Sequence, residues 1–256
     1  MDLDKQLETS KHITWGPVAA VIVTIATYFG AQIIAGMIIA IYPLLNMWSY
    51  EKTAKWLESS TVGQFVFVAI VESLTLWMIW IFLKSRKAKI SDIGLKKPRS
   101  RDVGYALLGF GMYFVLYIIV VQVASRLFPS LDVEQKQELG FNTATSGKML
   151  WLVFVSLVIL PPVTEEIVVR GFLYTGLRSK LRIVNAAIIT SILFAAAHLQ
   201  FGSGNALLWV AGLDTLILSF VLIFLRETTD SLWPCIGVHM IKNGLAFTAL
   251  FIFKVL

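Results

Sequence analysis

Long apolar runs, separated by short charged or turn-rich stretches, constrain the fold of this chain more than any other feature. Most are close to the roughly 20 apolar residues that a helix needs to cross a hydrocarbon core of about 30 Å. Only 15% of the 256 residues are charged and 57% are hydrophobic, whereas a soluble domain usually carries about 25% charged residues. The pattern therefore excludes a water-soluble domain and a disordered chain. Seven membrane spans are predicted, at about residues 14–42, 63–83, 103–123, 149–177, 183–199, 206–225 and 232–253.

These spans predict an all-α fold, a polytopic membrane bundle of about seven transmembrane helices, with six to eight compatible with the length. Residues 1–256 form a single membrane domain in this interpretation, and we expect a multi-pass integral protein of the plasma membrane. The net charge of +6 is read as a membrane orientation signal rather than as a sign of nucleic-acid binding. A dense basic stretch at residues 84–101 favours the cytoplasm for that loop and for the N-terminus. The single cysteine, Cys235, excludes a disulfide framework.

A few ionisable and amide side chains lie within the apolar runs. An ionisable residue at membrane depth costs at least about 2.5 kcal/mol on insertion scales, so each is a functional candidate by default. The fourth run contains two glutamates and an arginine, the fifth ends in a histidine, and the seventh contains a histidine and an asparagine. These six residues are Glu165, Glu166, Arg170, His198, His239 and Asn243.

Helical spacing separates the two glutamates. Glu166 and Arg170 are four residues apart, which predicts an ion pair on one helix face. Glu165 is rotated by about 100° from Glu166, so it is expected to face a different cavity. Phe194 and His198 have the same i,i+4 spacing, as do His239 and Asn243.

Two features predict irregular backbone at depth. Pro161 and Pro162 indicate a helix break and restart, whose freed backbone groups need protein or water partners. The glycine-bearing stretch 200–205 follows His198. With seven straight spans, Glu165 would lie mid-span, His198 near the outer end and His239 toward the inner end. Their convergence therefore requires tilted or broken helices, or a different number of spans.

A structural interpretation remains open for these side chains. A single membrane-embedded His, Asn or Glu is about as often an interhelical hydrogen-bonding group as a catalytic one. For Glu166 and Arg170 the structural interpretation is the stronger, as a support that holds Glu165. The combination is more specific, because it offers a general base, an orienting partner and oxyanion donors.

Three motifs now resemble a known family. EEIVVR at residues 165–170 matches EExxxR, FAAAH at 194–198 matches FxxxH, and HMIKN at 239–243 matches HxxxN. In this order they are similar to those of the CPBP intramembrane proteases, the CAAX protease and bacteriocin-processing (Abi) family that includes type II CAAX prenyl endopeptidases. The resemblance covers residues 161–244, which would form the catalytic motif region.

The resemblance implies an intramembrane endopeptidase that hydrolyses a peptide bond in a membrane-associated peptide or preprotein. Glu165 would be the general base that activates water, and His198 would orient that water. His239 and Asn243 would stabilise the oxyanion, while Glu166, Arg170 and Phe194 would support the site. Neither a cofactor nor a nucleic-acid partner is implied.

Alternatives remain open at this point. Glu165, His198 and His239 are also a possible three-ligand zinc set, although the HExxH helix of many zinc proteases is absent. A different class is a non-proteolytic membrane immunity or regulatory scaffold. For the other intramembrane acids, Glu72 and Asp214, a structural role is favoured, and contact with a substrate or a place in a proton path stay open. Lys242 is placed to pair with Asp214 or to extend toward the membrane surface.

Overall fold

The computed structural model describes the chain in six stretches, whose only regular secondary structure is helical, with no strand among the described residues. They comprise residues 13–133, 135, 139–141, 143–144, 147–200 and 207–254. Six helices in these stretches are long and apolar enough to cross a membrane. This confirms the predicted all-α membrane bundle. The six are Pro17–Leu45 (α2), Thr61–Ser85 (α4), Ser100–Leu127 (α5), Gly147–Arg178 (α6 to α8), Trp209–Thr229 (α10) and Trp233–Phe253 (α11 and its π-helical end).

The fifth predicted span is shorter than a membrane crossing. Helix α9 covers Ile183–Ala197, which is 15 residues and therefore about 22 Å at 1.5 Å per residue. His198 is the residue at its C-terminal cap. Because α9 ends early, His198 lies inside the bundle rather than at its outer end. The predicted irregular backbone at 200–205 lies, apart from Gln200, outside the described residues.

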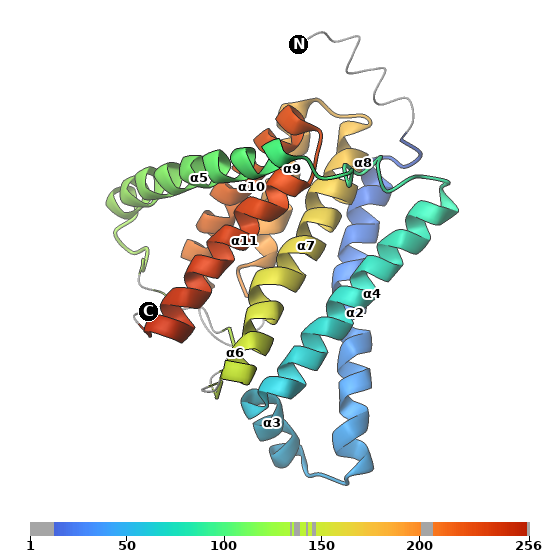
Figure 1. Ribbon diagram of the computed structural model, residues 1–256, viewed down its shortest axis with the longest axis vertical. Coiled ribbons are helices and arrows are strands. Elements are labelled where there is room, and N and C mark those ends of the chain that lie inside the picture. The colour runs from blue at the N-terminus through green and yellow to red at the C-terminus, as the bar shows by residue number, and fades with distance from the viewer. Residues whose placement is uncertain are drawn as a thin grey trace.

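The helices form two groups that share the composite helix α6–α8 (Figure 1). Helices α2 and α4 pack against each other and against that helix, while α5 packs across α10 and α11. Many large apolar side chains on the outer faces are exposed, among them Ile33, Trp77 and Leu108. Such surfaces suit the hydrocarbon core of a membrane. A short helix that the sequence did not predict, α3 (Tyr50–Ser59), connects α2 and α4, and the Ser49 side chain caps it.

The proline pair does not break the fourth span, which corrects the prediction. A π-helical segment, Val155–Ile159, precedes α7 (Leu160–Glu166), and a second one, Ile167–Leu173, follows it before α8 (Tyr174–Arg178). Wide turns of this kind accommodate a prolyl residue without ending the helix, and they are frequent at functional sites. The helix axis is kept, while the direction in which each side chain points is shifted.

The prediction that the prolines would need a compensating partner is confirmed at one group. Pro161 has no N–H, so it cannot donate to the carbonyl of Leu157 four residues earlier. The amide Nδ2 of Asn243 donates to that carbonyl instead, at 2.9 Å. This contact ties α11 to the composite helix about two turns before Glu165.

The basic loop between α4 and α5 docks on the connection between α10 and α11. Lys96 pairs with Asp230, and Arg226 pairs with the same carboxylate at 2.8 Å. The carbonyl of Gly94 accepts a hydrogen bond from the N–H of Leu232 at 3.0 Å. Gly94 has φ of +86°, and a Cβ there would lie 2.6 Å from the Arg226 guanidinium carbon. Only glycine fits this close approach.

Candidate active site

Helix α7 places two neighbouring glutamates in different surroundings. The Glu165 side chain is 30% exposed and lines a cavity, whereas the Glu166 side chain is fully buried. This is the separation that the 100° rotation between adjacent helical residues predicts. The two carboxylates can therefore perform different tasks.

Glu166 holds two partners at once. Its Oε1 lies 2.9 Å from Nη1 of Arg170, so the predicted ion pair is present, with both side chains fully buried. The same oxygen lies 2.9 Å from Nδ1 of His239. The sequence analysis expected Glu166 to support Glu165, and it did not predict the contact with His239. Glu166 thus fixes the orientation of an imidazole that comes from α11.

The two histidines turn the same ring atom toward Glu165. Nδ1 of His198 lies 2.9 Å from the carbonyl oxygen of Phe194, and Nδ1 of His239 faces the Glu166 carboxylate. Both partners are acceptors, so we assign the proton to Nδ1 in each neutral ring, which leaves a lone pair on Nε2. These Nε2 atoms lie 4.0 Å (His198) and 3.9 Å (His239) from Oε2 of Glu165.

Those separations are too long for direct hydrogen bonds. Such distances are expected where one water oxygen lies between the three polar atoms and forms a hydrogen bond with each of them. Oε2 of Glu165 is buried and has no hydrogen-bond partner among the described residues. Three helices, α7, α9 and α11, thus bring a carboxylate and two imidazoles to one point.

Phe194 packs among the charged and aromatic groups of the site. Its ring centroid lies 4.2 Å from the guanidinium carbon of Arg170 and 4.7 Å from the ring of His198, edge to face. The His239 ring is 6.2 Å away in a similar geometry. Nε and Nη2 of Arg170 have no hydrogen-bond partner among the described residues, so the aromatic face supplies part of the stabilisation of this buried cation.

Asn243 lies one turn beyond His239 on α11. One of its two amide hydrogens is used on the Leu157 carbonyl, which leaves the second available. In the structure, Asn243 therefore connects α11 to the composite helix. The role that the resemblance implies, a donor to an oxyanion, is not visible as a contact.

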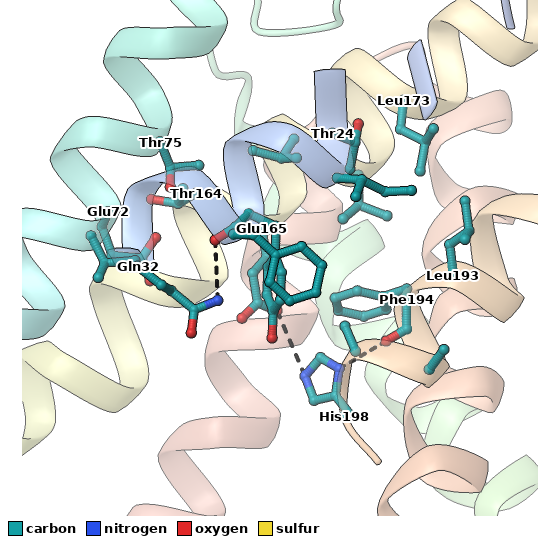
Figure 2. A pocket seen from close by; sticks show the side chains of 18 of the residues that line it. Thr24, Gln32, Glu72, Thr75, Thr164, Glu165, Leu173, Leu193, Phe194 and His198 are labelled. Atoms are coloured by element: carbon teal, nitrogen blue, oxygen red, sulfur yellow. Dashed lines mark hydrogen bonds and ion pairs between the residues drawn. The ribbon is translucent and has the colours of Figure 1, made fainter. Parts of the chain in front are cut away.

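The cavity beside Glu165 has a volume of about 610 Å³. Helices α2, α4, the composite helix and α9 form its walls, and Glu165 and His198 both face it (Figure 2). Its lining is mainly apolar, with Ile25, Phe29 and Val71 as examples. His239 is absent from the lining and is buried behind Glu165. Cavities of several hundred Å³ with a few converging polar groups are typical binding sites for ligands.

The remaining intramembrane charges separate into a paired and an unpaired group. Lys242 and Asp214 form an ion pair at 2.7 Å, as the sequence analysis suggested, and the Tyr113 hydroxyl donates to the same carboxylate. Glu72, in contrast, lines the cavity beside Thr164 and Thr75. Its place in the cavity was missed, because a lone glutamate in a span carries no spacing signal that links it to α7.

The same side chains also decide whether the site can hold a metal ion. Within the described stretches, no group of three or more His, Cys, Asp or Glu side chains is arranged to hold a metal ion. The donor types of Glu165, His198 and His239 still correspond to those of zinc sites, and each histidine has an acceptor on Nδ1, as zinc-binding histidines usually do.

Comparisons with known proteins point to one family. Residues 147–245 match the family described as type II CAAX prenyl endopeptidase Rce1-like. The chain is also similar to the membrane-embedded CAAX protease MroQ of Staphylococcus aureus (strain USA300), with 24% identity over 180 residues. That alignment covers 65% of this chain and 66% of the relative, so this chain spans slightly less than two thirds of the relative's length. No solved structure matches.

Proposed function

Because the chain belongs to the CAAX protease family, we propose that it is an intramembrane endopeptidase that hydrolyses a peptide bond in a membrane-associated peptide or preprotein. The matched segment, residues 147–245, contains all seven candidate site residues. The six apolar helices agree with a multi-pass integral membrane protein, and we place it in the plasma membrane. Nothing in the site requires the substrate to be prenylated.

One observation carries the proposal, namely that the Nε2 atoms of two histidines face a buried, unpartnered oxygen of Glu165 at 4.0 and 3.9 Å. A water molecule at this point would be within reach of all three groups. Glu165 would accept a proton from it as it attacks the scissile carbonyl, while His198 orients it. General-base catalysis of this kind contributes about 100-fold to 10,000-fold in rate.

The role of His239 follows from its hydrogen bond to Glu166. With the proton on Nδ1, its Nε2 has no hydrogen to donate to an oxyanion. His239 can serve as an oxyanion donor only where Nε2 has taken up a second proton from solvent before the substrate binds, while Nδ1 remains 2.9 Å from the Glu166 carboxylate. Glu165 would pass the proton that it takes from water to the leaving amine, and the Nε2 proton of His239, which comes from solvent before the reaction, would stay on the ring while it donates to the oxyanion of the tetrahedral intermediate.

The zinc-dependent alternative uses Glu165, His198 and His239 as ligands. In that case the metal would lower the pKa of a bound water and polarise the scissile carbonyl. Elemental analysis of the purified protein and the activity after treatment with a chelator distinguish the two mechanisms. We favour the metal-free mechanism, which predicts full activity without stoichiometric zinc.

Comparative peptidomics of membranes tests the function itself. Cells with the wild-type protein are compared with cells carrying Glu165→Ala, with Glu227→Gln as a matched control, because Glu227 is a helix-borne acid that pairs with Arg178 outside the site. We expect new peptide termini in the wild-type and Glu227→Gln cells and their loss in Glu165→Ala cells at equal protein levels. Identical peptide profiles, together with an unchanged cellular phenotype for Glu165→Ala and His239→Ala, would instead indicate the non-proteolytic immunity or regulatory scaffold.

A further inference from the structure

Glu72 differs from the other acids inside the helix bundle. Most of the others face a basic side chain, and for three of them that partner is Lys or Arg, whereas Asp102 accepts from the backbone N–H of Arg99 at the start of α5. Within the described part of the chain, no ion pair involves Glu72. The ion-paired acids are Glu166 with Arg170, Asp214 with Lys242 and Glu227 with Arg178, while the Glu165 carboxylate faces His198 and His239.

Glu72 lies on the wall of the cavity that also contains Glu165. It extends from α4, and its neighbours in the lining include Gln32 of α2, Thr75 and Thr164. Thr164 directly precedes Glu165, so the Glu72 carboxyl lies close to the proposed base. In Figure 2 the Glu165 side chain is seen between Glu72 and His198. Together, these side chains make a polar strip along a mainly apolar cavity.

An ionised carboxylate in apolar surroundings is costly unless a cation or several donors compensate it. The described residues beside Glu72 supply uncharged polar groups such as that of Thr164 and a second carboxylate, that of Glu165, but no ion-pairing Lys or Arg. The cavity opens onto the carboxyl, and its 610 Å³ leaves room for several substrate side chains. A cation that arrives with the substrate would therefore find both space and an unpaired opposite charge.

We propose that Glu72 is a specificity-determining residue that binds a positively charged group of the substrate peptide beside the bond that Glu165 cleaves. The inference rests on the proposed function. The recognised chemistry is an ammonium or guanidinium group, which can belong to a Lys or Arg side chain or to a free peptide N-terminus. The apolar walls from α2, α4 and α9 bind the apolar residues that flank this cation. The substrate class is thus an apolar peptide with one basic group near the cleavage site.

A library of internally quenched peptides tests this, with the full-length purified protein in lipid nanodiscs. Each peptide is apolar, with Lys, Arg, norleucine, Gln or Glu placed in turn at each position near its centre. Each is made with a free and with an acetylated N-terminus. We expect the wild-type protein to cleave peptides with a cation at one fixed position with a kcat/KM about tenfold or more above the norleucine peptide. Loss of the preference on acetylation assigns the cation to the N-terminus, and its persistence assigns it to the side chain.

Two variants link the preference to Glu72. Glu72→Gln keeps the shape and removes the charge, so the ratio of kcat/KM between cationic and norleucine peptides should fall to about one. Glu72→Lys should prefer peptides with Glu at the same position. Glu227→Gln serves as the control and should keep the wild-type ratio.

Binding to the Glu165→Gln protein gives a readout that needs no cleavage. Fluorescent versions of the cationic and norleucine peptides should differ in Kd by about tenfold, and adding Glu72→Gln should abolish the difference. Cleavage that depends on Glu165 but shows no preference for a cation, or a preference unaltered by Glu72→Gln, overturns the role of Glu72 alone. The absence of any Glu165-dependent cleavage overturns the proposed function and this inference with it.

Discussion

Replacing Arg170 with methionine should leave the Glu166 carboxylate buried without its cation. Both side chains are fully buried, and their N–O separation is 2.9 Å. Removal of one partner from a buried ion pair costs about 3 to 5 kcal/mol, because the other charge remains unpaired in a medium of low dielectric. The change also removes the cation that stacks at 4.2 Å on the Phe194 ring. We therefore expect Arg170→Met to lower the free energy of unfolding by about 3 to 5 kcal/mol.

A double-mutant cycle isolates the pair. Glu166→Gln removes the negative charge while it keeps an oxygen for Nδ1 of His239. Glu166→Gln combined with Arg170→Met leaves neither charge, so it should be less destabilised than the sum of the single changes by up to about 3 kcal/mol. Arg170→Lys is the matched control that keeps the charge and loses the planar guanidinium.

Unfolding in mixed detergent micelles, followed by circular dichroism at increasing fractions of denaturing detergent, measures these free energies. Additivity of the two single changes within about 0.5 kcal/mol would refute the argument. It would mean that the two side chains do not interact across 2.9 Å, and that Glu166 is not held in place for His239 by Arg170.

Two further predictions follow from contacts outside the carboxylate pair. Asn243→Ala should destabilise the protein by about 1 to 3 kcal/mol, because it leaves the Leu157 carbonyl, which Pro161 cannot pair, without its hydrogen bond. When unfolding is measured in the same micelles, this loss of stability should be smaller in a Pro161→Ala background. An equal loss in both backgrounds would contradict the prediction. Burial raises the pKa of Asp230, but hydrogen bonds from Lys96 and Arg226 outweigh it and hold that pKa below its ordinary value. The stabilisation is therefore present above the unfolded-state pKa of about 4 and is lost as the pH falls through the lower folded-state value. The hydrogen-exchange protection factors of the basic loop should fall over that range in the wild type, whereas those of Asp230→Asn should already be low at neutral pH.

The all-α membrane fold could be predicted because hydropathy and length are local properties of the sequence. The same rule failed for residues 183–199, whose apolar run suggested a crossing. Helix α9 ends at Ala197, so the run yields only about 22 Å of helix. Hydropathy does not register where a helix stops, and here the early stop brings His198 to Glu165. Straight spans would keep Glu165, His198 and His239 at different depths, and the early end of α9 lets His198 lie beside Glu165.

The relation between Glu165 and Glu166 could be predicted from helical geometry, since adjacent residues on a helix face different directions. The ion pair of Glu166 with Arg170 could be predicted for the same reason. The contact of Glu166 with His239 joins residues 73 positions apart in the sequence, and no periodicity reports on it. The place of Glu72 in the cavity depends likewise on how α4 packs against α7.

The proline pair shows a different limit. Pro161 and Pro162 have a strong helix-breaking tendency in isolation, and the sequence therefore predicted a break. The structure keeps the helix through a π-helical segment and one side-chain hydrogen bond from Asn243. That solution depends on a residue in another helix, so it was not visible in the local sequence.

The most direct measurement of the central claim is the rate at which purified protein in nanodiscs cleaves a peptide found by peptidomics. Wild type is compared with Glu165→Gln and with the control Glu227→Gln, with folding verified by circular dichroism and with metal content determined in the same samples. The account predicts a loss of at least about 100-fold in kcat for Glu165→Gln, wild-type kcat for Glu227→Gln, and activity without stoichiometric zinc. Cleavage by folded Glu165→Gln at the wild-type rate would contradict the assignment of Glu165 as the base.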